Sequence, residues 1–256
     1  MDHAGQGPVT TQRVIGIIQA RMGSTRLPGK VLMQVAGKSL IAHQIDRLRR
    51  CRLLSGLCVA TSDRPGDDPL ADSVAALGIP VFRGSETDVL DRFYRAALAQ
   101  GADIAVRFTG DCPLIDPALA DDLIGLYRNA EPALSYAAID VSHYPRGLDA
   151  EVVGMRDLRT AWQEAREDFE REHVMPFLWR RPDRFRLAWL GDATISAPWR
   201  WCVDTEQDFI LVRHLLETLL PAIPAFGWRD ADGAMRAHPD WGLINRDVVQ
   251  KTLPPT

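Results

Sequence analysis

The chain has 256 residues, enough to bury a sizeable core, so one domain is the most economical expectation. Its 30 basic and 34 acidic residues give a formal net charge of -4, which argues against a nucleic-acid partner. No apolar run approaches the roughly 18 residues of a membrane span, and the four cysteines form neither CxxC pairs nor a zinc-binding spacing, so we expect a cytoplasmic protein with reduced thiols.

The amino-terminal part leads into a strand and a basic loop. Residues 1–13 lack the apolar region of a signal peptide and are expected to form a disordered tail. Residues 14–18 are apolar and mostly β-branched, which predicts a buried strand. The loop after this strand holds Arg21, Arg26 and Lys30 among glycines that let a ligand approach the backbone. This composition suits a ligand with several phosphates, and an ordinary turn with solvated cations is the alternative.

The spacing of this loop excludes two common phosphate-binding motifs. Five residues separate Gly23 from Gly29, where a Walker loop has four, and Val31 follows Lys30 in place of Ser or Thr. The dinucleotide pattern G-x-G-x-x-G is also missing. ATP hydrolysis and NAD chemistry are therefore not expected.

The run ARMGSTRLPGK, residues 20–30, resembles the nucleotide-binding signature of the sugar cytidylyltransferases, which include Kdo and acylneuraminate enzymes and a spore-coat polysaccharide branch. The resemblance implies an α/β, Rossmann-like nucleotidyltransferase fold, with a mixed, mostly parallel sheet, helices on both faces and a small dimerisation and sugar-binding extension. It also implies transfer of CMP from CTP to an acidic sugar, with release of pyrophosphate, for surface polysaccharide biosynthesis. The later matches run to about residue 208, so we expect a single nucleotidyltransferase domain over residues 14–256. By resemblance, the nucleotide-binding residues of the loop are Ala20, Arg21, Gly23, Ser24, Arg26 and Lys30.

The next elements follow helix and strand periods. Ser39 is a plausible N-cap for a helix over residues 40–50, and residues 57–61 predict an apolar strand. Thr61 and Ser62 end this strand at the edge where open α/β sheets bind ligands, which makes them candidates for a base or ribose contact. A turn capped by their hydroxyl groups is the alternative.

A second segment carries the resemblance further. After a helix over residues 68–77 and a brief strand over residues 80–83, RGSETDVLDR resembles the family's R-G-x-x-x-D-V-L-x-R segment, which lies near the cytosine. The resemblance implies a nucleotide-binding role for Arg83. Asp88 is either a further nucleotide contact or the acidic residue that complements the dipole of the amphipathic helix that follows.

A metal ligand is predicted after the next strand. Residues 103–108 form a buried strand by composition, and Asp111 follows it between a glycine and a Cys-Pro pair. A carboxylate held at this edge suits Mg²⁺, which binds one or two protein carboxylates and leaves room for phosphates and water. TGDCPL also resembles the family's metal-binding turn, onto which Asp111 maps, and an Asx turn is the alternative. Arg107 is expected to pair with an acid or with substrate.

The acceptor sugar is expected to bind within about residues 134–190. A helix from Asp116 and a strand over residues 134–137 precede PRGLDAEVV, where strand alternation places Asp149 and Glu151 on one face. By resemblance to the family's G-x-D-x-E-V pattern, both are candidates for contacts to sugar hydroxyls or an amine. A solvated sheet face is the alternative.

Two helical stretches follow, over residues 155–167 and 168–181, the second interrupted by Pro176. His173 resembles a histidine that the spore-coat branch keeps near the sugar, and a surface or cap residue is the alternative. Phe177, Leu178 and Trp179, with the apolar residues of 185–190, offer more hydrophobic surface than a monomer readily buries, which predicts a homodimer.

The last informative stretch is RWCVDTEQDFIL, residues 200–211. A strand over residues 201–203 is predicted to end at Asp204, and a helix begins directly after it. The family's D-T-x-x-D turn provides a second metal carboxylate, so the resemblance makes Asp204 a second ligand of Mg²⁺. Thr205 and Asp208 are spaced as in a capping box, which gives Asp208 a structural role.

The family resemblance carried by these residues implies in-line attack of a sugar hydroxyl on the α-phosphorus of CTP. Arg21, Lys30 and Asp111 are the catalytic candidates, because the cations would stabilise charge on the leaving pyrophosphate while Asp111 and Asp204 hold Mg²⁺. A metal-dependent glycosyltransferase of related fold is the main alternative. A catalytically inactive binding or scaffolding protein is the second.

Overall fold

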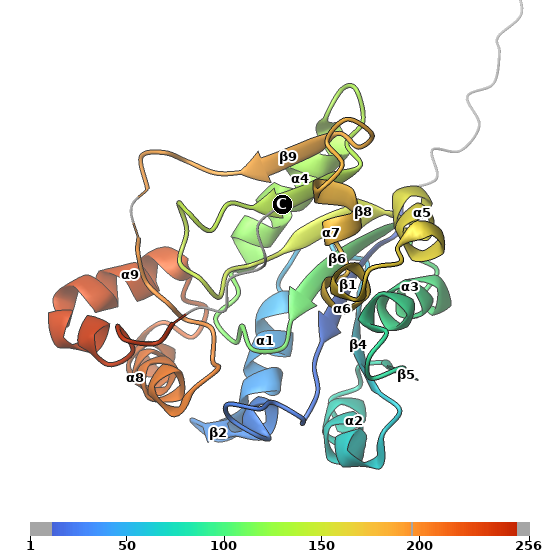
Figure 1. Ribbon diagram of the computed structural model, residues 1–256. Coiled ribbons are helices and arrows are strands. Elements are labelled where there is room, and N and C mark those ends of the chain that lie inside the picture. Colours follow the sequence, from blue (N-terminus) through green and yellow to red (C-terminus); the bar gives the residue numbers. More distant parts are fainter. Residues whose placement is uncertain (1–11, 196, 250–256) are drawn as a thin grey trace, which may run out of the picture.

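The computed structural model describes residues 12–195 and 197–249. Within these residues a sheet of seven strands runs through the middle of the molecule in the order β5-β4-β1-β6-β8-β7-β9 (Figure 1). β8 is antiparallel to both of its neighbours, and the other pairings are parallel. The strands are β1 (Val14–Gln19), β4 (Gly56–Ser62), β5 (Val81–Gly84), β6 (Ile104–Thr109), β7 (Tyr136–Ile139), β8 (Glu151–Gly154) and β9 (Leu187–Leu190).

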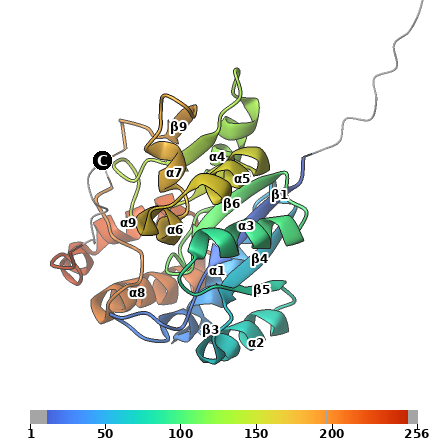
Figure 2. The same ribbon diagram turned by 45° about the vertical axis from the view of Figure 1, so that its right-hand side comes forward.

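Helices cover both faces of the sheet, as Figures 1 and 2 show. One hydrophobic core lies under α1 (Leu40–Leu48), α2 (Asp68–Ala76), α4 (Pro117–Asn129), α8 (Glu206–Ala222) and α9 (Trp228–Ala237). A second core lies on the other face, under α3 (Val89–Ala99), α5 (Met155–Glu164), α6 (Asp168–His173) and α7 (Pro176–Trp179). The short elements are β2 (Gln34–Val35), β3 (Lys38–Ser39) and the 3-10 helices Lys30–Leu32, Pro65–Asp67 and Pro239–Leu243.

The strands at the centre of the sheet have the composition that this burial requires. All six residues of β1 are buried, because the strand has a neighbour on each side and helices on both faces. Parallel strands in such a position are continuously apolar rather than alternating. Because β1, β4, β5 and β6 are parallel, their carboxyl ends meet at one edge of the sheet, where the loops can project polar side chains.

Most predicted elements lie within a few residues of their positions in the structure. Ser39 caps α1 as predicted, since its hydroxyl accepts a hydrogen bond from the backbone N–H of Ala42. The interruption predicted at Pro176 also exists, because α6 ends at His173 and α7 begins at Pro176.

The strand predicted over residues 201–203 is wrong. The backbone N–H of Trp201 donates to the Arg146 carbonyl at 2.7 Å, and that of Val203 donates to the Asp111 carbonyl at 2.8 Å. The segment therefore pairs with two loops and adds no strand to the sheet. Its side chains suggested a strand because Trp201 and Val203 are both fully buried.

Three other predictions concern the chain as a whole. Residues 1–11 of the expected disordered tail lie outside the described residues, and the backbone N–H of Arg13 donates to Asp103 at 2.8 Å. All four cysteines are buried and free of disulfides. Among residues 12–195 and 197–249, no helix is both long and apolar enough to cross a bilayer.

Candidate active site

The loop between β1 and Lys30 is held in shape from both sides. The backbone N–H of Gly29 donates to the Met22 carbonyl at 2.9 Å, and the N–H of Met22 donates to Asp67 at 2.6 Å. Gly29 has a φ of 71°, a conformation that a residue with a side chain adopts only at a cost. A Cβ at Gly110 would lie 2.6 Å from the Cβ of Ala20, so glycine there lets the ends of β1 and β6 approach.

Lys30 brings together two acidic residues that are far away in the sequence. Its ammonium lies 2.8 Å from Oδ1 of Asp204 and 3.5 Å from Oδ2 of Asp111, and Lys30 is only 8% exposed. The Arg26 guanidinium lies 2.7 Å from Oδ2 of Asp204. Asp111, Asp204, Lys30 and Arg26 therefore form one cluster, as the sequence analysis required.

The charged groups of this cluster shift one another's pKa values. Burial alone would lower the pKa of Lys30, but Asp111 and Asp204 outweigh burial and raise it. Burial likewise opposes ionisation of Asp204, but Lys30, and then Arg26, bring its pKa below the ordinary value. Both groups are therefore charged at neutral pH, which leaves a carboxylate ready for a cation and an ammonium ready for phosphate.

A buried network behind Asp204 fixes its position. Asp208 is fully buried and completes the capping box with Thr205, as predicted. The Asp208 carboxylate also accepts the backbone N–H of Asp204 at 3.0 Å, the Nε of Arg200 at 3.0 Å and the side-chain amide of Asn245 at 2.8 Å. Arg200 in turn contacts Asp204 at 2.7 Å. Neither Arg200 nor Asn245 was predicted to belong to the site, and only the proximity of Arg200 to the DTEQD turn could have indicated its role.

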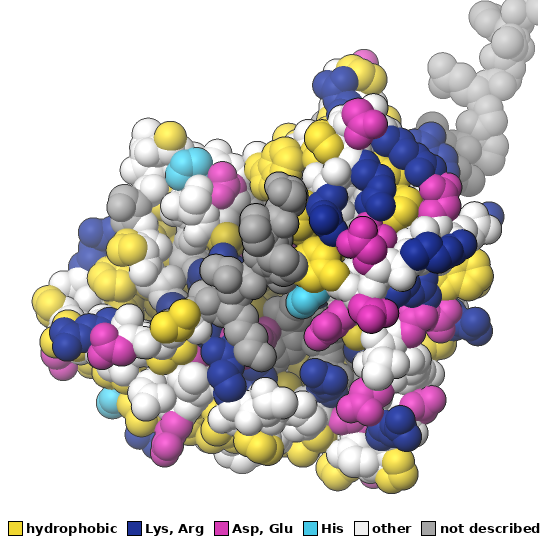
Figure 3. Space-filling view, in the orientation of Figure 1, with side chains coloured by type: hydrophobic (Ala, Val, Ile, Leu, Met, Phe, Trp, Pro, Cys, Tyr) yellow, Lys and Arg dark blue, Asp and Glu magenta, His cyan; other side chains and the backbone are white. Residues whose placement is uncertain are grey.

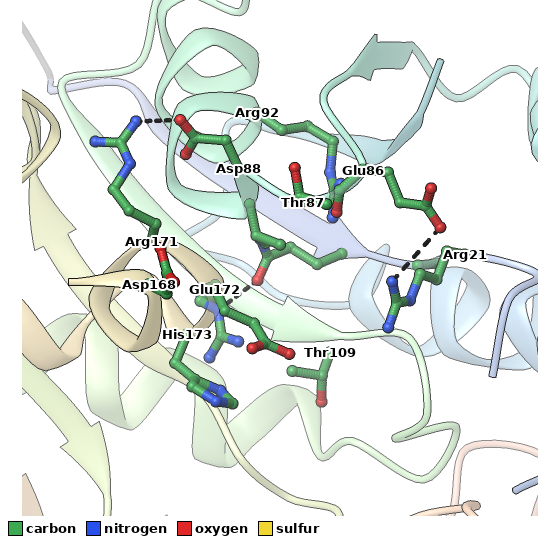
Figure 4. Close-up of a pocket in the computed structure, with 14 residues that line it drawn as sticks. Arg21, Glu86, Thr87, Asp88, Arg92, Thr109, Asp168, Arg171, Glu172 and His173 are labelled. Atoms are coloured by element: carbon green, nitrogen blue, oxygen red, sulfur yellow. Dashed lines mark hydrogen bonds and ion pairs between the residues drawn. The ribbon is translucent and has the colours of Figure 1, made fainter. Parts of the chain in front are cut away.

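A cavity of about 850 Å³ lies between the ends of β1 and β6 on one side and α3 and α6 on the other. Figure 4 shows Arg21 and Glu86 at one end of this cavity and Arg171 and Asp88 at the other. Arg21 lies 3.9 Å from Glu86, and Arg171 is ion-paired with Asp88. We call this space the first cavity.

A second cavity, of about 710 Å³, adjoins the first cavity. The two cavities share three lining residues, which are Arg107, Thr109 and His173. Asp149 and Glu151, both predicted to face the sugar, also line this second cavity. Glu151 is ion-paired with Arg107, as expected for Arg107, and accepts a hydrogen bond from the Tyr136 hydroxyl at 2.6 Å. Figure 3 shows this face of the molecule hollowed at its centre, with basic and acidic side chains around the hollow.

Burial shifts the pKa values of His173 and Asp149 in opposite directions. Burial lowers the pKa of His173, so the imidazole is neutral at physiological pH. Burial raises the pKa of Asp149, although its carboxylate accepts the backbone N–H of Gly147 at 2.7 Å. His173 lines both cavities and a smaller one, of about 330 Å³, that holds Ser24, Arg26 and Lys30. It therefore lies at the junction of the three spaces.

Four predicted nucleotide-binding residues, Gly23, Thr61, Ser62 and Arg83, line none of these cavities. Thr61 and Ser62 are buried, and the Ser62 hydroxyl donates to Asp67, the residue that holds the Met22 backbone. The Arg83 guanidinium donates to the carbonyls of Ser62 and Arg64 and to Asp68, because the edge strand β5 directs it toward the start of α2. Ser62 therefore supports the loop through Asp67, whereas Arg83 contacts the segment that leads into α2. Asp88 is the N-cap of α3, the structural alternative that its sequence left open.

The sequence matches a known family over most of its length. The family model described as Cytidylyltransferase matches residues 15–217. The chain belongs to the cytidylyltransferase family. Its resemblance to sugar cytidylyltransferases, its Rossmann-like nucleotidyltransferase fold and its assignment as a nucleotidyltransferase enzyme are thereby confirmed.

Individual relatives place this cytidylyltransferase near two groups of proteins. It is 35% identical to the spore coat polysaccharide biosynthesis protein SpsF of Bacillus subtilis over 211 residues, which cover 80% of this chain and 86% of SpsF. It is 42% identical to the 3-deoxy-manno-octulosonate cytidylyltransferase of Geobacter sulfurreducens over 114 residues, or 43% of this chain and 44% of that protein.

Solved structures share the fold. A cytidylyltransferase from Leptospira borgpetersenii has a TM-score of 0.85 at 26% identity, covering 96% of this chain and 100% of that chain. CMP:2-keto-3-deoxy-manno-octonic acid synthetase, solved as a complex with CTP, has a TM-score of 0.64 at 22% identity, covering 80% and 99% of the two chains.

Proposed function

We propose that this cytidylyltransferase transfers CMP from CTP to a hydroxyl of an acidic sugar and releases pyrophosphate, as a step in surface polysaccharide biosynthesis. The observation that carries the proposal is the position of Lys30, which contacts both Asp111 and Asp204 at the carboxyl edge of the sheet. An arrangement of two carboxylates and adjacent cations suits phosphoryl chemistry that depends on positioning and charge neutralisation.

In the proposed reaction the sugar hydroxyl oxygen forms a bond to the α-phosphorus, the bond from that phosphorus to the α,β-bridging oxygen breaks, and the hydroxyl proton passes to solvent. Lys30 and Arg26 exchange their contacts with Asp204 for contacts with phosphate oxygens. They then stabilise the negative charge that collects on the leaving pyrophosphate. Arg21, which is about half exposed at the same loop, binds the triphosphate from the solvent side.

Asp111 and Asp204 are the residues proposed to hold Mg²⁺. Their carboxylates are the hard oxygen donors that this ion prefers, and both line the smaller cavity with Lys30. Among the described residues no three His, Cys, Asp or Glu side chains form a metal-binding group, which suits an ion that completes its coordination with phosphate and water. When bound, the metal would supply charge neutralisation at the phosphates.

The second cavity is the proposed acceptor site, and residues 136–189 contribute part of its lining. Asp149, Glu151 and His173 provide polar contacts for hydroxyl groups, and Trp189, 54% exposed, provides an apolar surface for a sugar ring. Arg146 lies 3.7 Å from Asp149 and remains about half exposed. It supplies a cation for the carboxylate of an acidic sugar.

The test is to incubate the protein with CTP, Mg²⁺ and a panel of acidic sugars and to measure pyrophosphate release. Sugar-dependent release supports the proposal. Sugar loss from a CMP- or UDP-sugar without pyrophosphate would instead support a glycosyltransferase. If Asp111→Asn abolishes turnover while the variant remains folded, an inactive scaffolding protein is excluded.

A further inference from the structure

His173 lies where the proposed acceptor site meets the space around the basic loop. The described residues that line both the second cavity and the smaller cavity are Arg26, Thr109, Asp111, His173 and Asp204. An in-line reaction needs the attacking oxygen within about 3–3.5 Å of the phosphorus, so on the proposed function both atoms lie at this junction. A group that accepts the proton of the attacking hydroxyl must lie there as well.

The other residues at this junction are poorly suited to accept a proton. The Arg26 guanidinium stays protonated, and the Thr109 hydroxyl is a very weak base. Asp111 and Asp204 are the proposed metal ligands, and Asp204 already forms an ion pair with Arg26 at 2.7 Å. His173 remains, and imidazole is the side chain that most often serves as a general base.

The His173 imidazole is free to accept a proton. No described residue forms a hydrogen bond with either ring nitrogen, and the ring packs against Phe169 with the two ring centroids 4.8 Å apart. Burial has the largest effect on the pKa of His173 and lowers it, Glu172 raises it, and the paired Arg107 and Glu151 act in opposite directions. One nitrogen of the neutral ring therefore offers a lone pair near pH 7.

The charged groups that face His173 across the three cavities are themselves paired. Figure 4 shows Arg171 of the same helix directed toward Asp88 and away from the His173 ring. The ion pairs on the surrounding elements are Arg171 with Asp88, Arg146 with Asp149, and Lys30 with both Asp111 and Asp204. Because paired charges largely cancel, burial rather than one neighbouring charge governs the imidazole.

A strained turn fixes the end of α6 that carries His173. Val174, the next residue, has a φ of 74° and a ψ of -58°, and the backbone N–H of Met175 donates to the His173 carbonyl at 2.9 Å. This is the rare and strained form of the γ-turn. A β-branched residue at positive φ persists only where packing holds it, and Val174 and Met175 are fully buried in the second core. The turn therefore holds the backbone of His173 in place before a ligand binds.

We propose that His173 is the general base of the reaction. As the hydroxyl oxygen bonds to the α-phosphorus and pyrophosphate leaves with the electron pair of the broken bond, the hydroxyl proton moves to the free imidazole nitrogen. The imidazolium then releases this proton to solvent, which regenerates the base. The assignment rests on the proposed function and adds the group through which the proton reaches solvent. A positioned base contributes about 100- to 10,000-fold to the rate.

The experiment measures steady-state pyrophosphate release from CTP with Mg²⁺ between about pH 5 and about pH 9. The acceptors are acidic sugars that include 3-deoxy-manno-octulosonate and N-acetylneuraminate. The proteins are the wild type, His173→Gln, His173→Ala and the control His214→Gln, which replaces a histidine that stacks on Trp241 and lines none of the three cavities.

The wild-type kcat should fall in acid with a slope of about one, because a protonated imidazole cannot accept the proton. His173→Gln should lower kcat by about 100-fold or more, lose this fall in acid and leave the KM for CTP within about twofold. His214→Gln should match the wild type. Urea unfolding of each variant checks that the fold is retained.

Added imidazole separates proton transfer from a structural role. It should restore the kcat of His173→Ala by about tenfold or more, because a small base can enter the space that the side chain leaves. Variants of His173 that keep the fall in acid and are not rescued by imidazole would overturn the assignment, as would a kcat within about threefold of the wild type. If the wild type releases no pyrophosphate with any acceptor, the proposed function fails and this inference fails with it.

Two variants of Val174 test whether the turn positions the base. Val174→Gly should unfold at a higher urea concentration than Val174→Ala, because glycine adopts a positive φ without strain. Its kcat should nevertheless be about tenfold lower than that of Val174→Ala, because the relaxed turn no longer fixes His173. A lower urea midpoint for the glycine variant would refute the strain, and equal kcat values would refute the part of the turn in positioning His173.

Discussion

The buried carboxylate of Asp208 allows a sharp test of how the active site is supported. Its side chain is completely buried, and its two oxygens accept hydrogen bonds from Arg200, Asn245 and the backbone N–H groups of Asp204 and Thr205. In Asp208→Asn one oxygen becomes an NH₂ group. Whichever way the amide turns, its NH₂ group then faces other hydrogen-bond donors, because every group that contacts the Asp208 carboxylate is itself a donor.

The size of the effect follows from these contacts. Removing one partner of a buried ion pair costs about 3–5 kcal/mol, and because Arg200 keeps its contact with Asp204 the lower end of this range applies. We therefore expect Asp208→Asn to lower the free energy of unfolding by about 3 kcal/mol or more. The measurement is equilibrium urea unfolding followed by circular dichroism. Turnover should fall as well, since Asp208 fixes the backbone of Asp204.

The matched control is Asp230→Asn. Asp230 accepts the backbone N–H of Gly227 at the start of α9 at 2.7 Å, but it is exposed. Losing such an exposed cap should cost about 1 kcal/mol or less. In the double variant Asp208→Asn with Arg200→Met, the cost should be smaller than the sum of the two single costs by about 1–3 kcal/mol. Equal, small losses for Asp208→Asn and Asp230→Asn would refute the reasoning.

Three further predictions concern the cluster itself. Asp111→Asn should lower turnover by about 100-fold or more while the urea midpoint is unchanged, and full pyrophosphate release by this variant would contradict its proposed role. Lys30→Met should raise the KM for CTP, whereas Lys38→Met, which removes an exposed lysine, should not; equal steady-state constants for both would argue against phosphate binding by Lys30. Although burial opposes its ionisation, Asp204 has its pKa lowered by Lys30 and Arg26, so its ion pairs stabilise the fold at neutral pH and this stability is lost as the pH falls through the lowered pKa. The free energies of unfolding in urea of the wild type and Asp204→Asn should accordingly differ near neutral pH and become equal in acid. A difference between the two proteins that is the same at every pH would disprove this linkage.

The parts of the site that could be predicted are those that local patterns specify. Asp111 lies just past β6, and Lys30 ends the loop that follows β1, in segments that glycine and proline restrict. The convergence of Asp111 and Asp204 on Lys30, across 81 and 174 residues, depends on the strand order and could be expected only from the family resemblance.

The parts that could not be predicted depend on packing. Asn245 lies in the carboxyl-terminal segment, and nothing in its neighbours indicates that its amide binds Asp208. Arg83 and Arg92 belong to one motif, but they lie on different elements. The edge strand β5 directs Arg83 toward Asp68, whereas α3 places Arg92 on the wall of the first cavity. Residue type and spacing cannot distinguish these two positions.

The ion pairs around Asp204 balance the charges within one cluster of six residues. Arg26, Lys30 and Arg200 carry three positive charges, and Asp111, Asp204 and Asp208 carry three negative ones. A free phosphate or sulfate ion would have to break contacts without replacing them. A triphosphate that arrives with a divalent metal ion would replace both sets of contacts, because the phosphates would contact the basic residues and the metal ion would contact the carboxylates. On the proposed function, the pocket should therefore bind free phosphate or sulfate more weakly than the complex of a divalent metal ion with CTP.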